Sequence, residues 1–530
     1  MKGNYLHSLE RIYRKKVPAD KVITPELARY LTELSSEIGR QIGLLITRDG
    51  KITHVIVGDA KGVFISGLED FPLGKRALRG IRLVHTHLKN EPLSQDDLTD
   101  LALLRLDIIA AIGVKDNLPD NIYTAHLMPH GSEKPMDVSP PVNFYRFNLD
   151  FISFIESLEK EMDRKRRFDQ KDLREKSILI SVSKKPKYEQ EDSLEELKEL
   201  AFSSDVLVLD AVIQRPKDIN PKYLMGEGKL KDVIINALNK GATLLIFDQD
   251  LNPSQVKEIG ALTELKVIDR SQLILDIFAR RAHSRDGKVQ VELAQLKYRL
   301  PRLTGKGTAM SRLMGGIGGR GPGEMKLEID RRRVRDRITL LEKELKSLSE
   351  ARKQRKQRRV EKMIPIVSII GYTNAGKSTL LNSLTRSGVF VEEKMFATLD
   401  TASRRLRFPK ERDVIITDTV GFIRDLPKDL MTAFKSTLEE LQDADLLLHL
   451  VDISNPRFEQ QMESVENILR ELNLSDKKRI IVFNKTDKVA DEEVRNITLR
   501  YNAAAVSAID SSTFATLLKV IEENIWKAVI

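Results

Sequence analysis

The sequence predicts an α/β fold built from several domains, with a doubly wound sheet at its C-terminal end. Three observations predict this fold. Apolar runs alternate with amphipathic runs over residues 177–276, apolar residues recur at helical spacing over 289–303 and 334–348, and from residue 364 onward apolar runs end in glycine-rich or polar turns. A chain of 530 residues has room for about three or four domains.

We predict four segments along the chain. An N-terminal α/β extension occupies residues 1–172, and a small parallel α/β subdomain follows at 173–285. A helical arm occupies 286–361 and carries a glycine-rich loop at 315–323. The doubly wound domain occupies 362–530.

Composition limits the classes of protein that fit. With 41% hydrophobic and 31% charged residues, the chain is predicted to be soluble and globular. The N-terminus, MKGNYLHSLERIYRKK, has no apolar signal region, and no run approaches the roughly 20 apolar residues that cross a bilayer. We expect a cytoplasmic protein, a monomer, with no membrane partner. Because the chain has no cysteine, disulfides and thiol nucleophiles are excluded, and any metal must be held by oxygen or imidazole.

The small parallel subdomain is predicted from alternating strand and helix patterns. SILISVS, DVLVLDAVI, ATLLIFDQD and LKVIDR predict strands, while a charged stretch to Leu200, KLKDVIINALNKG and NPSQVKEIGAL predict helices between them. The sequence GEGK at 226–229 is a lone glycine match, so it predicts a loop and the start of a helix.

Two apolar stripes predict an antiparallel helical hairpin. Their residues recur at steps of four and three: Val289, Leu293, Leu296, Leu300 and Leu303, then Val334, Ile338, Leu341, Leu345 and Leu348. Pro301 is expected to end or kink the first helix. The loop GGIGGRGPG has helical patterns on both sides, which does not suit a phosphate cradle. Arg312 and Arg320 beside bare backbone suit close approach to RNA.

Most of the net charge of +10 lies in one segment. Residues 331–360 hold 13 Lys and Arg against 4 Asp and Glu, a net of +9. Such a block is typical of a solvated helix face or of a surface that meets an anionic partner.

The strongest functional signal is IPIVSIIGYTNAGKSTLLNSL, residues 364–384. It predicts a buried strand, a loop with the spacing of a P-loop from Gly371 to Gly376, and an amphipathic helix, which is the context that the motif requires. The glycines let backbone amides face phosphates. Lys377 is predicted to reach the β and γ phosphates, and Ser378 is predicted to bind Mg²⁺.

Two further segments predict contacts with the γ-phosphate. FATLD offers Thr398 to complete the Mg²⁺ shell, with Thr401 as the alternative. VIITDTVG is an apolar strand ending in Asp418, which is predicted to hold Mg²⁺ through water, and the amide of Gly421 is predicted to face the γ-phosphate. The predicted catalytic residues are Lys377, Thr398 and Gly421.

Two segments predict specificity for guanine, and therefore GTP as the substrate. IIVFNKTD ends in Asn484, Lys485 and Asp487, and the carboxylate of Asp487 can accept hydrogen bonds from guanine N1–H and its 2-amino group, which adenine lacks. AAAVSAID supplies Ser507 and Ala508 for contact with the guanine oxygen. The predicted GTP contacts are Gly371, Tyr372, Thr373, Asn374, Ala375, Gly376, Lys377, Ser378, Phe396, Ala397, Thr398, Leu399, Asp400, Asp418, Thr419, Val420, Gly421, Asn484, Lys485, Thr486, Asp487, Ser507, Ala508 and Ile509.

Phe422 stands where Ras-like GTPases carry the glutamine that orients the attacking water. Because phenylalanine has no polar side-chain atom, we predict slow hydrolysis until a partner supplies the missing group. Asn374 resembles the asparagine with which some GTPases hold K⁺ near the phosphates, and an amide that only shapes the loop is the alternative.

Over about residues 177–530 the chain resembles the ribosome-associated GTPase family HflX. The resemblance rests on the α/β segment, GKVQVELAQLKYRLPRL, GGIGGRGPGE, the basic helix, FATLD and DTVGF. It implies a GTPase that binds GTP and GDP with Mg²⁺, docks on the large ribosomal subunit, and acts in ribosome rescue, splitting or assembly. It also implies that the arm reaches ribosomal RNA. The chain departs from the family in its N-terminal extension and in stopping soon after the nucleotide domain.

In the extension, IRLVHTH places His85 and His87 on one face of a predicted strand, as metal ligands would lie. Asp96 or Asp97 is the third candidate ligand for Zn²⁺. With the hairpin-like RQIGLLITRDGKITHVIVGD, this segment resembles the JAMM/MPN metallopeptidase pattern.

Two departures from that pattern argue against peptidase activity. The spacer from His87 to Ser94 is one residue short, and Arg40 and Gln41 stand where a glutamate is expected before IGLL. A capping box made by Ser94 and Asp97 also explains the sequence. We therefore predict an MPN-like or other α/β scaffold without peptidase activity, and bound Zn²⁺ is not expected there.

The main prediction is a ribosome-dependent GTPase. The alternatives are a zinc metallopeptidase regulated by GTP and a GTPase that binds RNA or membrane surfaces generally through its basic arm.

Overall fold

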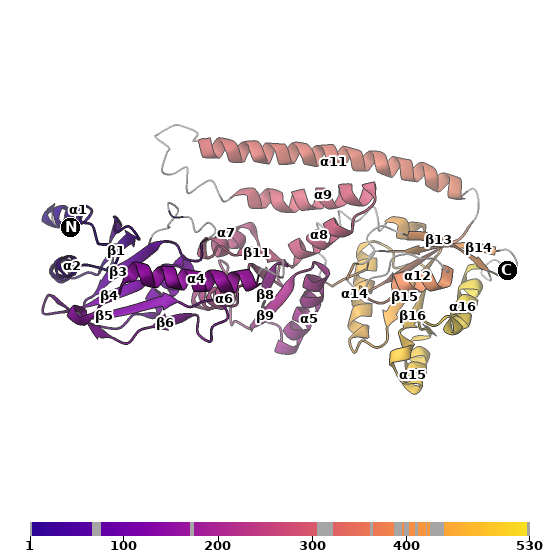
Figure 1. Cartoon of the computed structure of the whole chain (residues 1–530). Helices are drawn as coiled ribbons and strands as arrows, with labels where there is room; N and C mark the ends of the chain where they lie inside the picture. The colour runs from indigo at the N-terminus through magenta and orange to yellow at the C-terminus, as the bar shows by residue number, and fades with distance from the viewer. Residues whose placement is uncertain are drawn as a thin grey trace. The chain divides into compact units, whose positions relative to one another are not determined.

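The computed structural model of the chain describes residues 3–65, 71, 76–169, 174–304, 322–360, 364–385, 395–396, 402–408, 412–419, 421–424 and 439–526. The chain divides into two compact units. One comprises residues 1–184, 209–245 and 258–267, and the other comprises 185–208, 246–257 and 268–530. Within the described residues, three β-sheets follow one another along the chain (Figure 1).

The N-terminal extension is built on a seven-stranded sheet in the order β2-β1-β3-β4-β5-β6, with β7 paired to β5. Its strands are β1 (Ile42–Thr47), β2 (Ile52–Val57), β3 (Ile81–His87), β4 (Ile109–Lys115), β5 (Leu118–Leu127), β6 (Met136–Val138) and β7 (Val142–Asn143). β1 pairs antiparallel with β2 and β3, and β3 runs parallel to β4. The predicted hairpin and the predicted IRLVHTH strand are therefore confirmed.

Helices cover both faces of this sheet. They are α1 (Gly3–Ile12), α2 (Pro25–Ile38), α3 (Gln95–Leu104) and α4 (Phe151–Asp169), with the 3₁₀ turn η1 (Phe144–Arg146). Side chains alternate along β1, so Leu44 packs in the core with α2 and α4 while Leu45 packs with α3. Val84 faces α2 and α4, so His85 and His87 lie on the face that α3 covers.

The second sheet has the order β11-β10-β8-β9. Its strands are β8 (Lys176–Val182), β9 (Leu207–Gln214), β10 (Leu244–Phe247) and β11 (Lys266–Asp269), and its helices are α5 (Lys187–Ser203), α6 (Glu227–Asn239), α7 (Pro253–Leu262) and α8 (Arg270–Arg281). Backbone hydrogen bonds from Thr243 to Lys176 and from Lys266 to Thr243 join the starts of three strands, which therefore run parallel as predicted. The GEGK sequence starts α6, with Gly226 as its N-cap.

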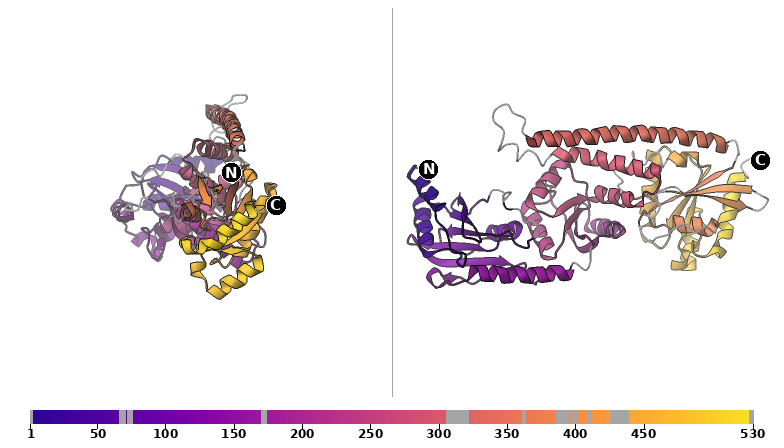
Figure 2. Two further views of the ribbon diagram at one scale, coloured as in Figure 1. Left: turned by 90° about the vertical axis from the view of Figure 1, so that its right-hand side faces the viewer. Right: turned by 45° about the horizontal axis from the view of Figure 1, so that its top comes forward.

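The predicted hairpin is confirmed in α9 (Arg285–Arg299) and α11 (Pro322–Val360), which lie side by side (Figure 2). Seven of the ten predicted stripe residues share one cluster: Val289, Leu293, Leu296, Ile338, Leu341, Leu345 and Leu348. Leu300, Leu303 and Val334 are not part of it. α9 stops at Arg299, and the 3₁₀ turn η2 (Leu300–Thr304) contains Pro301, so the helix ends where proline was expected to end it. Residues 305–321, with Arg312, Arg320 and most of the glycine-rich loop, lie outside the described residues.

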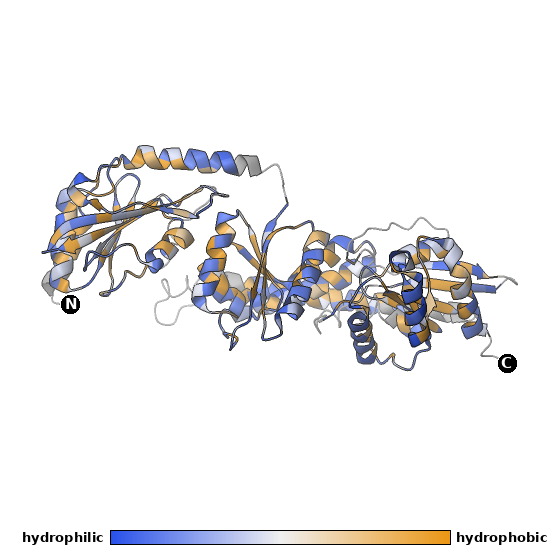
Figure 3. Cartoon of the chain, turned by 90° about the horizontal axis from the view of Figure 1, so that it is seen from below, coloured by the Kyte–Doolittle hydropathy of each residue, from blue (hydrophilic) through white to orange (hydrophobic). Residues whose placement is uncertain are grey.

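Apolar residues lie on the strands of the sheets and also along the helices (Figure 3). α11 spans 39 residues but is strongly charged. Within the described parts of the chain, no helix has both the length and the apolar content needed to cross a membrane.

Truncation of Leu341 is expected to loosen the hairpin. Its side chain is fully buried between α9 and α11, so Leu341→Ala should destabilise their packing by about 2–5 kcal/mol. Hydrogen–deuterium exchange of α9 and α11 measures the effect as faster exchange. Leu340→Ala is the matched control, since that neighbouring side chain is 53% exposed; equal effects of the two variants would contradict the packing described for the arm.

The C-terminal sheet has six strands in the order β13-β14-β12-β15-β16-β17. They are β12 (Ile366–Gly371), β13 (Ala402–Phe408), β14 (Arg412–Asp418), β15 (Leu446–Asp452), β16 (Arg479–Asn484) and β17 (Ala504–Ala505). Its helices and 3₁₀ turns are α12 (Lys377–Thr385), α14 (Phe458–Glu471), α15 (Asp491–Tyr501), α16 (Phe514–Trp526), η4 (Glu439–Asp443), η5 (Thr486–Lys488) and η6 (Ser511–Thr513). β12 runs parallel to both β14 and β15, so the strand order reverses at β12, where doubly wound sheets bind their ligands.

His449 on β15 is expected to make the stability of this domain depend on pH. Burial, together with the positive charges of Arg479 and Lys377, lowers the pKa of His449 to about 4. A histidine in an unfolded chain has a pKa of about 6.5, so below that pH the unfolded state binds more protons than the folded state, and stability falls as pH falls. Between about pH 7 and pH 5 the free energy of unfolding should drop by about 2 kcal/mol on this account.

Denaturant unfolding at the two pH values measures this loss. Trp526, the only tryptophan, packs against Phe408 with ring centroids 5.4 Å apart and so reports on this domain by fluorescence. The variant His449→Gln cannot titrate and should lose about 2 kcal/mol less than the parent chain. If His449→Gln lost as much stability as the parent chain, the pH dependence would come from other titratable groups.

Candidate functional site

The P-loop connects the end of β12 to the start of α12. Gly371 has φ +151°, and a Cβ there would lie 2.2 Å from the carbonyl oxygen of Leu450. Gly376 has φ +91°, and a Cβ would lie 2.3 Å from the amide nitrogen of Asn484. Both positions therefore require glycine. Asn374, between them, is exposed and has φ 64°, a left-handed conformation that asparagine tolerates.

Lys377 is held over this loop. Its Nζ donates to the carbonyl oxygens of Tyr372 at 2.8 Å and of Gly371 at 3.1 Å. Burial lowers the pKa of Lys377 to about 8, and the negative charge of Asp418 opposes that shift. The ammonium group is therefore fixed beside the loop amides that are predicted to face the phosphates.

Two of the three predicted Mg²⁺ ligands, Ser378 and Asp418, meet at the same edge of the sheet. Ser378 lies in the first turn of α12 and Asp418 ends β14, and the Ser378 hydroxyl donates to a carboxylate oxygen of Asp418 at 2.6 Å. Hydroxyl and carboxylate oxygens are the ligands that Mg²⁺ prefers, so the pair fits this ion. Thr419, also in the predicted set, is buried, and its hydroxyl donates to the carbonyl of Ile369 at 2.7 Å.

The segment after Asp418 lies directly against the P-loop. The Phe422 amide donates to the Gly371 carbonyl at 3.1 Å, and the Thr373 amide donates to the Phe422 carbonyl at 2.8 Å. A Cβ on Gly421 would lie 3.1 Å from the Lys377 ammonium. The Phe422 side chain is only 4% exposed, so this position places an apolar ring, and no polar group, next to the nucleotide loop.

The predicted guanine contacts are joined by Asn484. Its amide group donates to the Ala375 carbonyl at 2.8 Å and accepts from the Ala508 amide at 2.9 Å, so it ties the P-loop to the last guanine segment. The Ser507 hydroxyl donates to the Asp487 carboxylate at 2.6 Å and orients it. Asp487 is exposed, so its carboxylate is accessible to a guanine base.

The remaining predicted contacts lie around this pair of loops. The Lys485 ammonium lies 2.7 Å from the Asp452 carboxylate, and Thr486 starts the turn η5. Ile509 is 76% exposed. Phe396 is buried, with its ring centroid 4.6 Å from that of Phe278.

Several predicted residues cannot be placed. Ala397, Thr398, Leu399, Asp400 and Val420 lie outside the described residues, as does Thr401, the alternative to Thr398. Their roles therefore stay predictions.

Sequence reasoning missed a polar network around Tyr372. Its hydroxyl donates to Glu196 of α5 and accepts from the backbone amide of Arg424 at 3.0 Å. Glu196 also lies 2.9 Å from Arg270 and 2.7 Å from Arg424. Burial and the negative charge of Glu196 raise the pKa of Tyr372, which stays protonated. No sequence signal distinguishes Glu196 from the other acidic residues of its helix.

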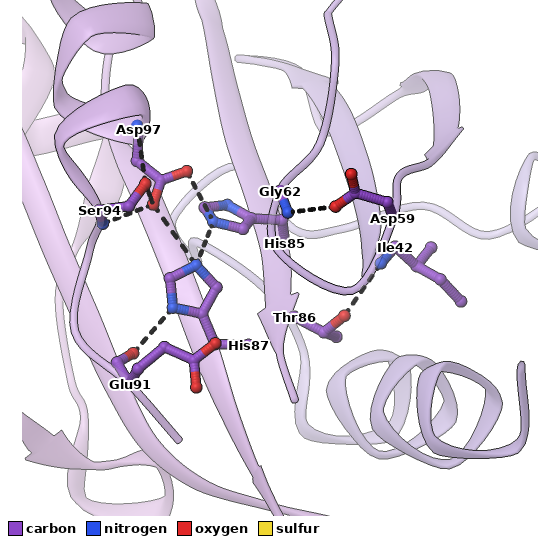
Figure 4. A network of polar contacts seen from close by, with 9 residues as sticks. All are labelled: Ile42, Asp59, Gly62, His85, Thr86, His87, Glu91, Ser94 and Asp97. Atoms are coloured by element: carbon purple, nitrogen blue, oxygen red, sulfur yellow. Dashed lines mark hydrogen bonds and ion pairs between the residues drawn. The ribbon is translucent and has the colours of Figure 1, made fainter. Parts of the chain in front are cut away.

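A second cluster lies in the N-terminal sheet, where the structure brings together His85, His87 and Asp97 (Figure 4). The two histidine Nε2 atoms are 2.9 Å apart, and they lie 3.2 and 3.4 Å from the Asp97 carboxylate oxygens. Asp97 also forms the predicted capping box with Ser94, which is confirmed. The candidate Asp96 is exposed and is not part of the cluster.

Burial and mutual contacts shift the pKa values of all three groups in this cluster. Burial lowers the pKa of His85. For His87, burial acts in the same direction, but hydrogen bonds with Asp97 and the Glu91 carbonyl outweigh it and raise the pKa. Burial would raise the pKa of Asp97, yet the two histidines hold it well below its usual range.

Comparison with known proteins identifies the family. Three family models match successive parts of the chain: "GTP-binding GTPase N-terminal" over 191–279, "GTP-binding GTPase Middle Region" over 281–359 and "50S ribosome-binding GTPase" over 366–485. GTPase HflX of Caldanaerobacter subterraneus is 47% identical over 354 residues, which cover 67% of this chain and 81% of that relative. GTPase HflX of Escherichia coli is 42% identical over 328 residues, which cover 62% and 77% of the two chains.

A solved structure is also similar. The GTP-binding protein from the archaeon Sulfolobus solfataricus in complex with GDP is 27% identical, and the match covers 66% of this chain and 98% of that chain with a TM-score of 0.35. The assignment rests on the sequence matches and on the nucleotide site described above. The chain belongs to the HflX family of GTPases, and it is an enzyme that binds and hydrolyses GTP.

Proposed function

We propose that this GTPase turns over slowly by itself and is activated when its helical arm docks on the large ribosomal subunit in the cytoplasm. The observation that carries the proposal is the buried apolar ring of Phe422 at the position where a polar side chain would orient water. The matched family model is described as a 50S ribosome-binding GTPase, which supports the choice of partner.

The nucleotide site has the parts needed for charge stabilisation. Lys377 would contact the β and γ phosphates, the amide of Gly421 would contact the γ-phosphate, and Thr398 would close over it. Members of the family depend on Mg²⁺, which Ser378 and Asp418 would hold and which neutralises phosphate charge when bound. At position 422 the apolar phenylalanine side chain offers no group that could orient the attacking water.

A partner can supply such a group. Phosphoryl transfer depends mainly on positioning and charge, and a catalytic group donated in trans raises the rate by about 10³–10⁵-fold. Hydrolysis would then be coupled to arrival at the ribosome, which suits a factor acting in ribosome rescue, splitting or assembly.

The charges of the arm support an RNA partner. Two acidic residues of α11, Glu342 and Glu344, pair with α9 through Lys297 at 2.7 Å and Arg285 at 2.8 Å. A third pair joins Arg337 of α11 to Glu292 of α9 at 2.7 Å. The hairpin therefore pairs two acidic residues and one basic residue of α11, and leaves an excess of basic residues at its surface. Exposed arginines of α11 include Arg332, Arg333 and Arg335. A polyanion that meets this surface releases counterions, which favours docking.

Cosedimentation with purified large subunits tests the proposal. Binding should be tight with a non-hydrolysable GTP analogue, weaker with GDP, and should fall as salt rises, because phosphate contacts dominate affinity for nucleic acid. The double variant Arg332→Glu with Arg333→Glu should lose binding. Arg495→Glu, an exposed arginine on α15, is the control. If the parent chain stayed in the supernatant in every nucleotide state, the ribosomal role would be wrong.

We further propose that Asn374 holds K⁺ beside the phosphates, where the cation would assist charge stabilisation. Its exposed amide in the P-loop supports this role, although its φ of 64° also suits an amide that only shapes the loop. Faster hydrolysis in K⁺ than in Na⁺, lost in Asn374→Ala, is expected. Equal rates in both salts would leave Asn374 as a loop-shaping residue.

A further inference from the structure

The cluster of His85, His87 and Asp97 has the geometry of a metal site. The Nε2 atoms of the two histidines are 2.9 Å apart. His85 Nε2 lies 3.2 Å from Asp97 Oδ1, and His87 Nε2 lies 3.4 Å from the other carboxylate oxygen, Oδ2. A tetrahedral Zn²⁺ with bonds of about 2.0–2.1 Å requires ligand atoms about 3.3 Å apart. The three side chains therefore already lie at the spacing that a single ion would impose.

Neighbouring groups orient these ligands for coordination. His87 Nδ1 lies 2.8 Å from the carbonyl oxygen of Glu91, and since a carbonyl only accepts, Nδ1 carries the proton. In the neutral imidazole of His87, Nε2 then carries the lone pair, and this atom faces the cluster. Asp97 is held by the amide and hydroxyl of Ser94, each 2.7 Å from the same carboxylate oxygen. A backbone carbonyl behind a histidine is a typical second contact in metal sites.

Protein atoms alone leave polar atoms of the cluster without enough hydrogen-bond partners. His85 is fully buried, and among the described residues its Nδ1 has no hydrogen-bond partner. Because His87 Nε2 bears a lone pair, one proton on His85 Nε2 would have to serve both that nitrogen and the Asp97 carboxylate. Buried hydrogen-bond acceptors that face one another without enough protons between them raise the free energy of the folded state. A bound cation would pair with these acceptors and remove that cost.

We propose that His85, His87 and Asp97 bind one Zn²⁺ ion in the N-terminal extension. Two imidazoles and one carboxylate suit Zn²⁺ and disfavour Mg²⁺ and Ca²⁺, which prefer oxygen ligands. Water would complete the coordination, as it does in three-ligand zinc sites. This proposal reverses the expectation from sequence and does not depend on the ribosomal role.

The position of the cluster in the fold indicates what the ion would do. His85 and His87 lie at the end of β3 and Asp97 lies in the first turn of α3, so the ion would fix that helix to the sheet. Ligands that bind only the folded state stabilise it. Zn²⁺ should therefore raise the thermal stability of the extension.

Metal analysis of the full chain tests the site. The protein is stripped with chelator, dialysed against Zn²⁺ or Mg²⁺, washed, and analysed for metal content. One equivalent of Zn²⁺ should remain per chain after washing, and thermal unfolding should shift upward with Zn²⁺ but not with Mg²⁺. Co²⁺ in place of Zn²⁺ should give the visible absorption of a tetrahedral complex.

Variants assign the ion to these residues. His85→Asn and Asp97→Asn should each lose the retained Zn²⁺; asparagine at 97 keeps an oxygen that can accept from Ser94, so the helix cap survives. His54→Asn is the control, because this partly exposed histidine on β2 lies outside the cluster. Slow hydrogen–deuterium exchange of β1 and β4 in each variant, as in the parent chain, verifies that the extension has folded. If the parent chain retained no Zn²⁺, or if Asp97→Asn retained as much as the parent, the proposal would be overturned.

Discussion

Replacing Lys377 by alanine is expected to lower the rate constant of GTP hydrolysis by at least about 10²–10³-fold. The ammonium group is the one cation that the P-loop motif itself supplies to the phosphates, and two carbonyl hydrogen bonds hold it in place before the nucleotide arrives. A group positioned in advance stabilises developing charge without reorganisation. Nucleotide affinity should fall as well, because the same ammonium contacts the ground-state phosphates.

Single-turnover hydrolysis at saturating GTP measures this effect and separates it from weaker binding. Lys488→Ala is the matched control, since Lys488 is exposed on the neighbouring turn η5. Hydrolysis by Lys377→Ala at the rate of the control would mean that another group bears the charge of the transition state.

Replacing Asp487 by asparagine is expected to weaken binding of guanine nucleotides by about 10²–10⁴-fold, since two hydrogen bonds to a charged acceptor contribute about 1.5–3 kcal/mol each. The carboxylate is exposed and fixed by the Ser507 hydroxyl, so it can accept from N1–H and the 2-amino group together. Asparagine offers one carbonyl oxygen as an acceptor and one NH₂ group as a donor, which matches xanthine better than guanine.

Calorimetric titration with GDP and XDP measures the change. The parent chain should prefer GDP, and Asp487→Asn should prefer XDP. Asp491→Asn, an exposed carboxylate four residues later, should behave like the parent. An Asp487→Asn variant that still bound GDP as the parent does would remove Asp487 from the base-recognition site.

Local patterns were sufficient to predict much of the fold. The strand, loop and helix pattern predicts glycine at 371 and 376, where the backbone leaves no room for a side chain. In the structure, a Cβ at either position would lie too close to a neighbouring residue. The helical arm was predicted from the spacing of its apolar residues, because Val289 and Leu341 could be buried only if the apolar stripes of the two helices packed against each other. The segment boundaries at 172, 285 and 361 stay predictions.

Long-range contacts could not be predicted in the same way. Asn484 was predicted as a base contact, but its two hydrogen bonds to Ala375 and Ala508 depend on three loops meeting at one sheet edge. Glu196 lies 176 residues from Tyr372 in sequence, so only the folded chain reveals their contact.

The histidine cluster could likewise be predicted only in part from the sequence. The sequence placed His85 and His87 on one face but left Asp96 and Asp97 as alternatives and gave no expectation of bound metal. The capping box that seemed to compete with metal binding in fact orients Asp97 toward both histidines, because one of its carboxylate oxygens accepts from Ser94 while both oxygens lie near imidazole nitrogens.

Steady-state GTP hydrolysis by the full chain, alone and with purified large ribosomal subunits, tests the central claim most directly. The account predicts slow hydrolysis by the isolated protein and a rise of about 10³-fold or more when subunits are added. Rapid hydrolysis by the protein alone, unchanged by subunits, would contradict it, because a catalytic centre with Phe422 beside the P-loop would then need no partner.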